Sequence, residues 1–359
     1  MMPKETHFAL RTSALLTAIG LFVFVVFLFA FGVNPLQVAE TVKTANPFYY
    51  LLAFAALLLS VTFYSLTWNR LLNLLSVKSS LLKAFQFIWI GDFVNQMIPA
   101  ESISGDITRI YLMSKESGEN AGKVVASVMG HRILSSAITF GGFLISAAYF
   151  VLVYSPSLLV LEVIVLVIAV SIFSLSLLIY LSIRKQSTEK IVNWVVCLLA
   201  RISRGRWQFD SLKSSAEKML NAFHEGTKTL IEHPKKLVSP LFFSFVAWLF
   251  DLLIAVLVFF SIGSLGVTIS FPAIVIVYSI IIGIQNIPLG IPGEVGLVEI
   301  VMTTLYTLLG SGDPIVMSAI ATGATLLIRI LTLWTRIIIG GVAFQWLGIK
   351  GFKNSATPN

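Results

Sequence analysis

The chain has 359 residues, of which 57% are hydrophobic and only 12% are charged, and its formal net charge is +8. Its mean hydropathy of +0.91 lies above that of soluble domains, so a soluble globular protein is excluded. The single cysteine, Cys197, excludes an intramolecular disulfide framework and a cysteine metal site. With only four histidines, we expect neither a metal nor another cofactor.

Long apolar runs follow one another along the chain. A hydrocarbon core about 30 Å thick requires roughly 20 apolar residues per helix. Runs of this kind occupy residues 12–33, 48–68, 137–154, 157–183, 237–262 and 315–347. The first is longer than the apolar core of a signal peptide, so we interpret it as an uncleaved anchor. The sequence therefore predicts an all-α polytopic membrane bundle of about eight transmembrane segments.

Two polar interruptions, at residues 91–109 and 285–299, break this pattern. Each contains an asparagine, then Ile-Pro, then a glycine followed by an acid. The matching residues are Asn95, Ile98-Pro99 and Gly105-Asp106 in the first, and Asn286, Ile287-Pro288 and Gly293-Glu294 in the second. Inside a membrane, irregular backbone is tolerated only where it is buried in protein or lines a cavity. The pair of interruptions therefore predicts a site.

Positive charge is concentrated at residues 184–236, which carry +6 of the net +8. Cytoplasmic loops hold such an excess, so we expect this segment and both termini in the cytoplasm, and the protein in the cell membrane. Apolar residues recur at helical spacing over 191–202 and 212–231, which predicts amphipathic surface helices. We favour an ordinary cytoplasmic connection over specific lipid recognition, and expect no nucleic-acid binding.

Counting crossings suggests how the interruptions are arranged. Segments 81–98 and 121–136 must together cross the membrane an even number of times, as two spans or as a hairpin entering from the cytoplasmic side; we favour the hairpin, with its turn near 99–123. A second hairpin, 273–288 with 293–310, would enter from the outer side before a long helix from 315. Two broken hairpins of opposite topology are typical of inverted repeats in transporters. We expect one domain at 1–350, with halves 1–183 and 237–350 around the basic segment 184–236, and a tail at 351–359.

Three arginines lie inside or beside apolar runs: Arg109, Arg132 and Arg329. An arginine at bilayer depth is costly unless it is paired or reaches water, so each is a candidate functional residue. The guanidinium group presents a fork of donors that matches phosphate oxygens. We therefore expect these arginines to bind an anionic lipid head group.

Other residues of the interruptions complete the predicted site. Asp106, Glu294 and Glu299 either pair with the arginines until a phosphate arrives, or form permanent buried ion pairs that only hold the bundle together. The predicted binding residues are Arg109, Arg132, Arg329, Asn95, Gly105, Asp106, Asn286, Gly293, Glu294 and Glu299. Asp251, within the 237–262 run, is either a proton site or the partner of an arginine, and we favour the partner role.

Most of the chain resembles the transmembrane region of lysylphosphatidylglycerol synthases and its stand-alone, flippase-like relatives. In the first half the family pattern is matched by Gly91, Asn95, Pro99, Gly105, Asp106, Arg109, Ala126-Ser127-Val128 and Arg132. In the second half it is matched by Pro288, Pro292-Gly293, Gly296, Glu299 and Arg329, while Glu294 replaces the usual second glycine. Without the soluble aminoacyl-transferase domain of the full synthases, the resemblance implies lipid handling without lipid aminoacylation.

From residues and resemblance together we expect a translocase, and not an enzyme. It would move an anionic phospholipid or polyprenyl-phosphate lipid between leaflets through a polar cavity, while the lipid tails stay in the bilayer. One alternative is a lipid-binding accessory subunit that acts with a lipid-modifying or glycosylation enzyme of envelope synthesis. The other is a membrane-embedded transferase that uses a lipid-linked phosphate sugar.

Overall fold

The computed structural model describes residues 35–98, 103–202, 209–263, 266–287 and 290–355. The predicted anchor at 12–33 lies outside these residues. The described residues form helices, with one isolated bridge between Thr268 and Ser311. In chain order the helices are α2 (Pro35–Lys43), α3 (Pro47–Leu74), α4 (Leu81–Met97), α5 (Ile103–Ser117), α6 (Ala121–Tyr154), α7 (Leu158–Ile183), α8 (Lys185–Ile202), α9 (Phe209–Glu232), η1 (Pro234–Leu237), α10 (Val238–Ile262), α11 (Phe271–Gln285), η2 (Pro292–Glu294), α12 (Leu297–Leu309), α13 (Pro314–Arg329), η3 (Ile330–Thr335) and α14 (Arg336–Ser355).

Five helical segments in the described part of the chain are long and apolar enough to cross a membrane. They are Pro47–Leu74, Ala121–Tyr154, Leu158–Ile183, Pro234–Ile262 and Pro314–Leu347. Their starts follow local rules: Asn46 accepts the N–H of Phe48 at 2.9 Å, and Asp313 accepts the N–H of Ile315 at 2.9 Å, each with proline at the first helical position. The structure confirms the prediction of a polytopic helical bundle.

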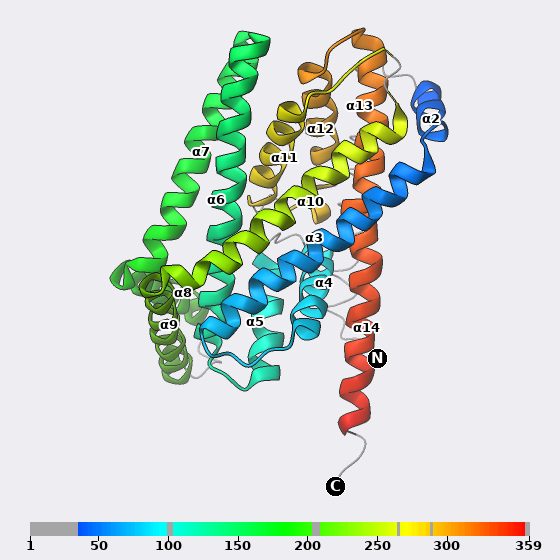
Figure 1. Cartoon of the computed structure of the whole chain (residues 1–359). Coiled ribbons are helices and arrows are strands. Elements are labelled where there is room, and N and C mark those ends of the chain that lie inside the picture. The colour runs from blue at the N-terminus through cyan, green and yellow to red at the C-terminus, as the bar shows by residue number, and fades with distance from the viewer. Residues whose placement is uncertain (1–34, 99–102, 203–208, 264–265, 288–289, 356–359) are drawn as a thin grey trace.

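Two hairpins of short helices enter the bundle from opposite faces (Figure 1). The α4–α5 hairpin occupies the lower half of that view and the α11–α12 hairpin the upper half. Helix α4 ends at Met97, and the next residue, Ile98, has the extended backbone (φ −104°, ψ 125°) that a residue before proline favours. Gly293 and Gly296 have φ values of 59° and 91°, which a glycine adopts without strain, and they turn the chain into α12.

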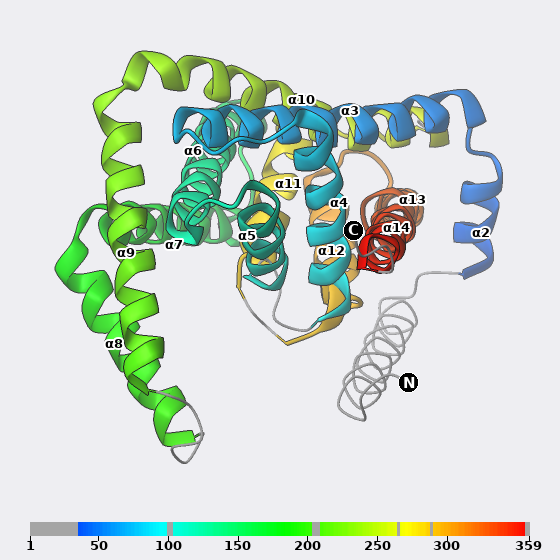
Figure 2. The same cartoon turned by 90° about the horizontal axis from the view of Figure 1, so that it is seen from below.

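The two halves of the bundle repeat one order of elements in opposite directions. In the first half α3 precedes the α4–α5 hairpin and α6 follows it; in the second, α10 precedes the α11–α12 hairpin and α13 follows it. Helices α3 and α10 lie side by side along one edge of the bundle (Figure 2), and the N–H of Asn46 before α3 donates to the carbonyl of Ser261 near the end of α10 at 2.7 Å. The two helices are therefore antiparallel, as an inverted repeat requires.

One predicted boundary is wrong. The second limb of the first hairpin is α5, Ile103–Ser117, and residues 121–136 belong to the single long helix α6, Ala121–Tyr154. The apolar-run criterion splits α6 because its first half carries Lys123, His131 and Arg132, and Arg132 faces the interior of the bundle. The crossing count is unchanged, since a hairpin contributes none. The second hairpin, predicted at 273–288 and 293–310, is observed as α11 and α12.

The basic segment forms the two predicted helices, α8 and α9, at the end of the bundle where α14 also ends (Figure 1). We call this end the basic face. The apolar side of α9 packs against α6 rather than standing free, with Leu220, Phe223 and Leu230 buried. Close contact between these helices depends on Gly226, where an added Cβ would lie 2.8 Å from the Cβ of Ala126.

Candidate functional site

A cavity of about 300 Å³ lies where the two hairpins meet, with walls from α3 to α6 and α10 to α14. Eight of the ten predicted binding residues line it: Asn95, Asp106, Arg109, Arg132, Asn286, Gly293, Glu294 and Arg329. The other two lie directly behind the wall, where Gly105 is hydrogen-bonded to Asn95 and Glu299 to Arg329. The structure thus brings together residues that are up to 234 positions apart, Asn95 and Arg329.

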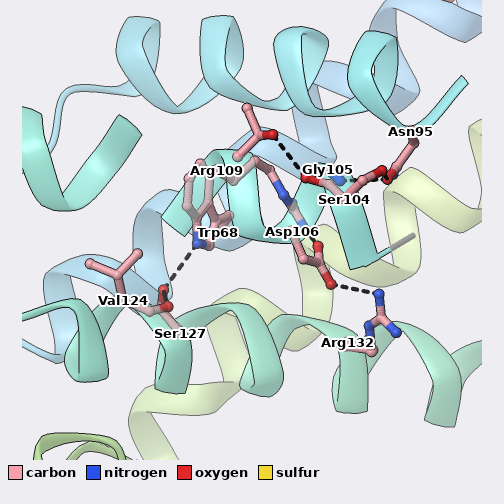
Figure 3. Close-up of polar contacts among 10 residues, drawn as sticks. Trp68, Asn95, Ser104, Gly105, Asp106, Arg109, Val124, Ser127 and Arg132 are labelled. Atoms are coloured by element: carbon pink, nitrogen blue, oxygen red, sulfur yellow. Dashed lines mark hydrogen bonds and ion pairs between the residues drawn. The ribbon is translucent and has the colours of Figure 1, made fainter. Parts of the chain in front are cut away.

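On the α5–α6 wall, two arginines share one carboxylate (Figure 3). Asp106 accepts a hydrogen bond from Arg109 through one oxygen and from Arg132, at 2.5 Å, through the other. The side chain of Arg132 is 21% exposed and that of Asp106 is 10% exposed, so the group faces the cavity without being sealed from it. This wall therefore carries two positively charged side chains, Arg109 and Arg132, and one negatively charged side chain, Asp106.

The side chain of Arg109 is held from behind by an aromatic ring. Its guanidinium carbon lies 5.2 Å from the centre of the Trp68 ring, a cation–π geometry. Trp68 is fully buried, and its indole N–H donates to Ser127 at 3.0 Å. Because Ser127 in turn donates to the carbonyl of Val124 at 2.7 Å, the ring is fixed to α6 (Figure 3). The spacing of apolar residues along α3 does not predict that Trp68 contacts Arg109.

Asn95, near the end of α4, connects the two helices of the first hairpin by hydrogen bonds to the start of α5. Its side-chain oxygen accepts the N–H of Gly105 at 2.6 Å and the hydroxyl of Ser104 at 3.0 Å. Helices α4 and α5 cross at two glycines, because a Cβ on Gly91 would lie 2.9 Å from Cγ of Arg109 and a Cβ on Gly105 would lie 2.6 Å from Cγ of Asn95. The paired glycines and the asparagine therefore set where α5 presents Asp106 and Arg109.

The third predicted arginine, Arg329, is bound differently. Its Nε donates to Glu299 at 2.6 Å and its Nη2 to the carbonyl of Gly293 at 2.5 Å. The second oxygen of Glu299 accepts the N–H of Gly296 at 2.7 Å. Arg329 and Glu299 are each 4% exposed. This pair ties the start of α12 to α13, as the structural alternative in the sequence analysis expects.

Two further predicted residues lie at the turn of the second hairpin. Glu294 is buried, accepts a hydrogen bond from Gln285 at 2.7 Å, and has a φ of 48°. It thus adopts the left-handed backbone that a glycine would take at this position. Asn286 lies at the edge of the cavity, where its amide donates to the carbonyl of Ile282 at 2.8 Å. Asn286 therefore helps to end α11.

A third charged group contains a residue that the sequence analysis missed, Arg336. Its guanidinium lies 3.5 Å from Asp92 and 3.9 Å from Asp251, which confirms that Asp251 is the partner of an arginine. Asp251 also accepts hydrogen bonds from Ser60 at 2.5 Å and Tyr278 at 3.0 Å. The signal was present, because Arg336 also lies inside the apolar run 315–347. A π-helical turn, η3, separates it from Arg329, and such turns occur frequently at functional sites.

The charges around the cavity are balanced overall but unevenly distributed. Four arginines and four carboxylates line it in the described part of the chain: Arg109, Arg132, Arg329, Arg336, Asp92, Asp106, Asp251 and Glu294. The α5–α6 wall has the excess of positive charge, and the remaining walls have the excess of negative charge. Among the described residues, no group of three or more His, Cys, Asp or Glu side chains is placed to hold a metal ion.

Comparison with known proteins shows which family the chain matches. A family model described as the lysylphosphatidylglycerol synthase TM region matches residues 15–340. A UPF0104 membrane protein of Pyrococcus horikoshii is 24% identical over 335 residues, which cover 91% of this chain and 95% of the relative. A UPF0104 membrane protein of Methanothermobacter thermautotrophicus is 22% identical over 88% of this chain and 90% of its own. One from Methanocaldococcus jannaschii is 24% identical over 86% and 87%.

Proposed function

Because the chain belongs to the lysylphosphatidylglycerol synthase TM-region family, we propose that it is a lipid translocase whose polar cavity receives a phosphate-bearing head group. The lipid tails stay in the bilayer while the head group passes between the hairpins. The cargo would be an anionic phospholipid or a polyprenyl-phosphate lipid. No bond of the lipid is made or broken in this proposal, so the chain acts without enzymatic chemistry.

The observation that carries the proposal is the sharing of Asp106 by two arginines at the cavity wall. Asp106 divides its two oxygens between the two guanidinium groups, and a phosphate that enters beside them would add negative charge to a wall with two arginines and one aspartate. Arg132 and Arg109 come from different helices, so a phosphate between them would accept forked, charge-assisted hydrogen bonds from two directions. The tightly held pair of Arg329 and Glu299 then serves as the fixed side of the site.

The arrangement of the hairpins supports access from both leaflets. Each hairpin enters from a different face, and both hairpins contribute residues to the same cavity. Small opposite movements of the two halves would open the cavity first to one leaflet and then to the other, as in transporters built from inverted repeats. By the positive-inside rule, we propose that the basic face lies in the cytoplasm, with both termini on that side of the cell membrane.

Reconstitution tests the proposal. Liposomes containing the purified protein and a lipid labelled on its head group are exposed to an external quencher, and the decay of the protected signal reports exchange between leaflets. We expect faster exchange of phosphate lipids than in protein-free liposomes. Arg132→Gln should slow this exchange roughly 10- to 100-fold, the loss expected for hydrogen bonds to a charged group.

Arg70→Gln is the matched control, because Arg70 is exposed on the basic face, with its guanidinium over the ring of Phe243 and outside the cavity. This variant should retain wild-type exchange. Exchange no faster than in empty liposomes would refute the translocase. Formation of a new product from a labelled lipid-linked donor would instead favour the transferase, and loss of a partner enzyme's activity with unchanged lipid movement would favour the accessory subunit.

A further inference from the structure

A second, apolar pocket of about 190 Å³ lies near the basic face between α6, α7 and α9. Its walls include Leu71, Met129, Ile133, Ile179, Leu230 and Leu237. Helix α6 separates it from the polar cavity, since Arg132 and Ser135 line the cavity while Met129 and Ile133 line the pocket. The pocket is therefore a separate feature, and its chemistry is that of hydrocarbon.

Two glycines set how closely α9 packs against α6 beside this pocket. Near its middle, α9 lies tight against α6 through Gly226. One turn further along α9, Leu230 meets Gly130 of α6, where an added Cβ would lie 3.0 Å from the leucine methyl group. Gly130 thus lets Leu230 approach α6 closely, and on the far side α7 lines the pocket with Ile179, Ser182 and Ile183.

The pocket lies among the ends of three candidate membrane spans. It is bounded by residues at the termini of three candidate spans: Leu71 near the end of Pro47–Leu74, Ile183 at the end of Leu158–Ile183, and Leu237 near the start of Pro234–Ile262. Beyond these residues the chain leaves the hydrocarbon. An occupant would therefore have an apolar part in the pocket and continue into the head-group layer.

Three exposed basic residues are sequence neighbours of residues that line the pocket. Arg184 comes directly after Ile183, Lys228 directly after Thr227, and Lys236 directly before Leu237. All three are exposed. They come from three separate segments of the chain, each next to a residue that lines the pocket, and Lys228 also lies 3.6 Å from Glu232. Basic side chains at this level attract anionic lipids.

We propose that this pocket holds one acyl chain of an anionic phospholipid from the leaflet at the basic face, with the lipid phosphate against Arg184, Lys228 and Lys236. Such a lipid would bridge α7, α9 and the start of α10, and so would fasten the basic segment to the bundle. The bound lipid is a resident one and is distinct from any cargo in the polar cavity.

Native mass spectrometry of the purified full chain tests the proposal. The protein in mixed micelles is titrated with phosphatidylglycerol or phosphatidylcholine of identical acyl chains, and the populations of lipid-bound protein are compared. We expect preferential retention of one phosphatidylglycerol. Arg184→Gln/Lys236→Gln should weaken its binding roughly 10- to 30-fold, whereas Lys78→Gln/Lys115→Gln, which removes two exposed charges elsewhere, should leave it unchanged.

Filling the pocket distinguishes a bound acyl chain from a purely electrostatic surface contact. Ile179→Trp should occupy the pocket and displace the lipid, while Ile172→Trp is the control, since Ile172 is 51% exposed on the same helix and does not line the pocket. Equal binding of the two lipids would overturn the proposal. Binding to Ile179→Trp as tight as to Ile172→Trp would overturn it too, even if the charge variant is weakened. These results are independent of leaflet exchange.

Discussion

The pair of Arg329 and Glu299 gives the sharpest prediction, the effect of Glu299→Gln on stability. The substitution keeps the shape of the side chain and removes its charge, so Arg329 is left as a buried cation without its carboxylate. Both residues are 4% exposed, and water therefore cannot replace the lost interaction. Breaking a buried ion pair by removing one partner costs about 3–5 kcal/mol.

Two additional features determine where in that range the loss should fall. Glu299 also accepts the N–H of Gly296 at 2.7 Å, so the first turn of α12 loses a charged acceptor. Arg329 retains its hydrogen bond to the carbonyl of Gly293, and the amide oxygen of the substituted side chain still offers an acceptor, both of which reduce the loss. We expect a decrease of about 3 kcal/mol in the free energy of unfolding, measured by titration with a denaturing detergent.

A control with the same substitution makes the test specific. Glu116 pairs with Lys83 at 3.0 Å, but their side chains are 42% and 34% exposed, and an exposed pair contributes at most about 1 kcal/mol. Glu116→Gln should therefore change stability little. If Glu299→Gln is no more destabilising than Glu116→Gln, Arg329 is not held as a fixed structural cation, and its assignment to the rigid side of the site is wrong.

Three more outcomes follow from the structure. Gly105→Ala should destabilise the protein by about 1–3 kcal/mol through overpacking, whereas Gly141→Ala, where an added Cβ meets no atom within 4 Å, should not; thermal unfolding compares them. Arg132→Lys keeps the charge and loses the planar fork, so leaflet exchange should fall roughly tenfold, and unchanged exchange would show that charge alone suffices. Burial lowers the pKa of His224, so the folded protein favours the neutral imidazole, and the stability that this contributes is present above the unfolded pKa and is lost as pH falls. The free energy of unfolding of His224→Gln should therefore fall less than that of wild type between about pH 7.5 and about pH 5. Parallel pH profiles of the two proteins would contradict this.

Sequence reasoning reached the hairpins because their causes are local. Clusters of proline, glycine and polar residues between apolar runs favour the end of a helix, and they can be recognised from a short stretch of sequence. It failed at α5 and α6 for the opposite reason. Arg132 is part of a continuous helix whose polar side is turned inward, and inward orientation depends on neighbours that come from other parts of the chain.

The same distinction applies to the candidate site. Arginine at bilayer depth identifies a candidate without naming its partner, so Arg329 with Glu299 and Arg132 with Asp106 are indistinguishable in sequence. The partners are determined by how the hairpins pack. Gly91 and Gly105 let α5 lie close to α4, and in this position Asp106 of α5 reaches both Arg109 on its own helix and Arg132 on α6. Arg336 was missed although it meets the same criterion, and its partner Asp251 was recognised without it.

The two halves of the bundle use one pattern of residues for two different physical purposes. Each hairpin offers carboxylates to an arginine on the long helix that follows it, Arg132 on α6 and Arg329 on α13. In the second half, Glu299 and the Gly293 carbonyl bind Arg329 completely, so this half is rigid around its cation. In the first half, Asp106 is divided between Arg132 and Arg109, so the α5–α6 wall has more arginines than carboxylates at the cavity. A cavity that binds and releases an anion requires both properties, a fixed wall against which the anion is held and a wall whose charge the anion completes.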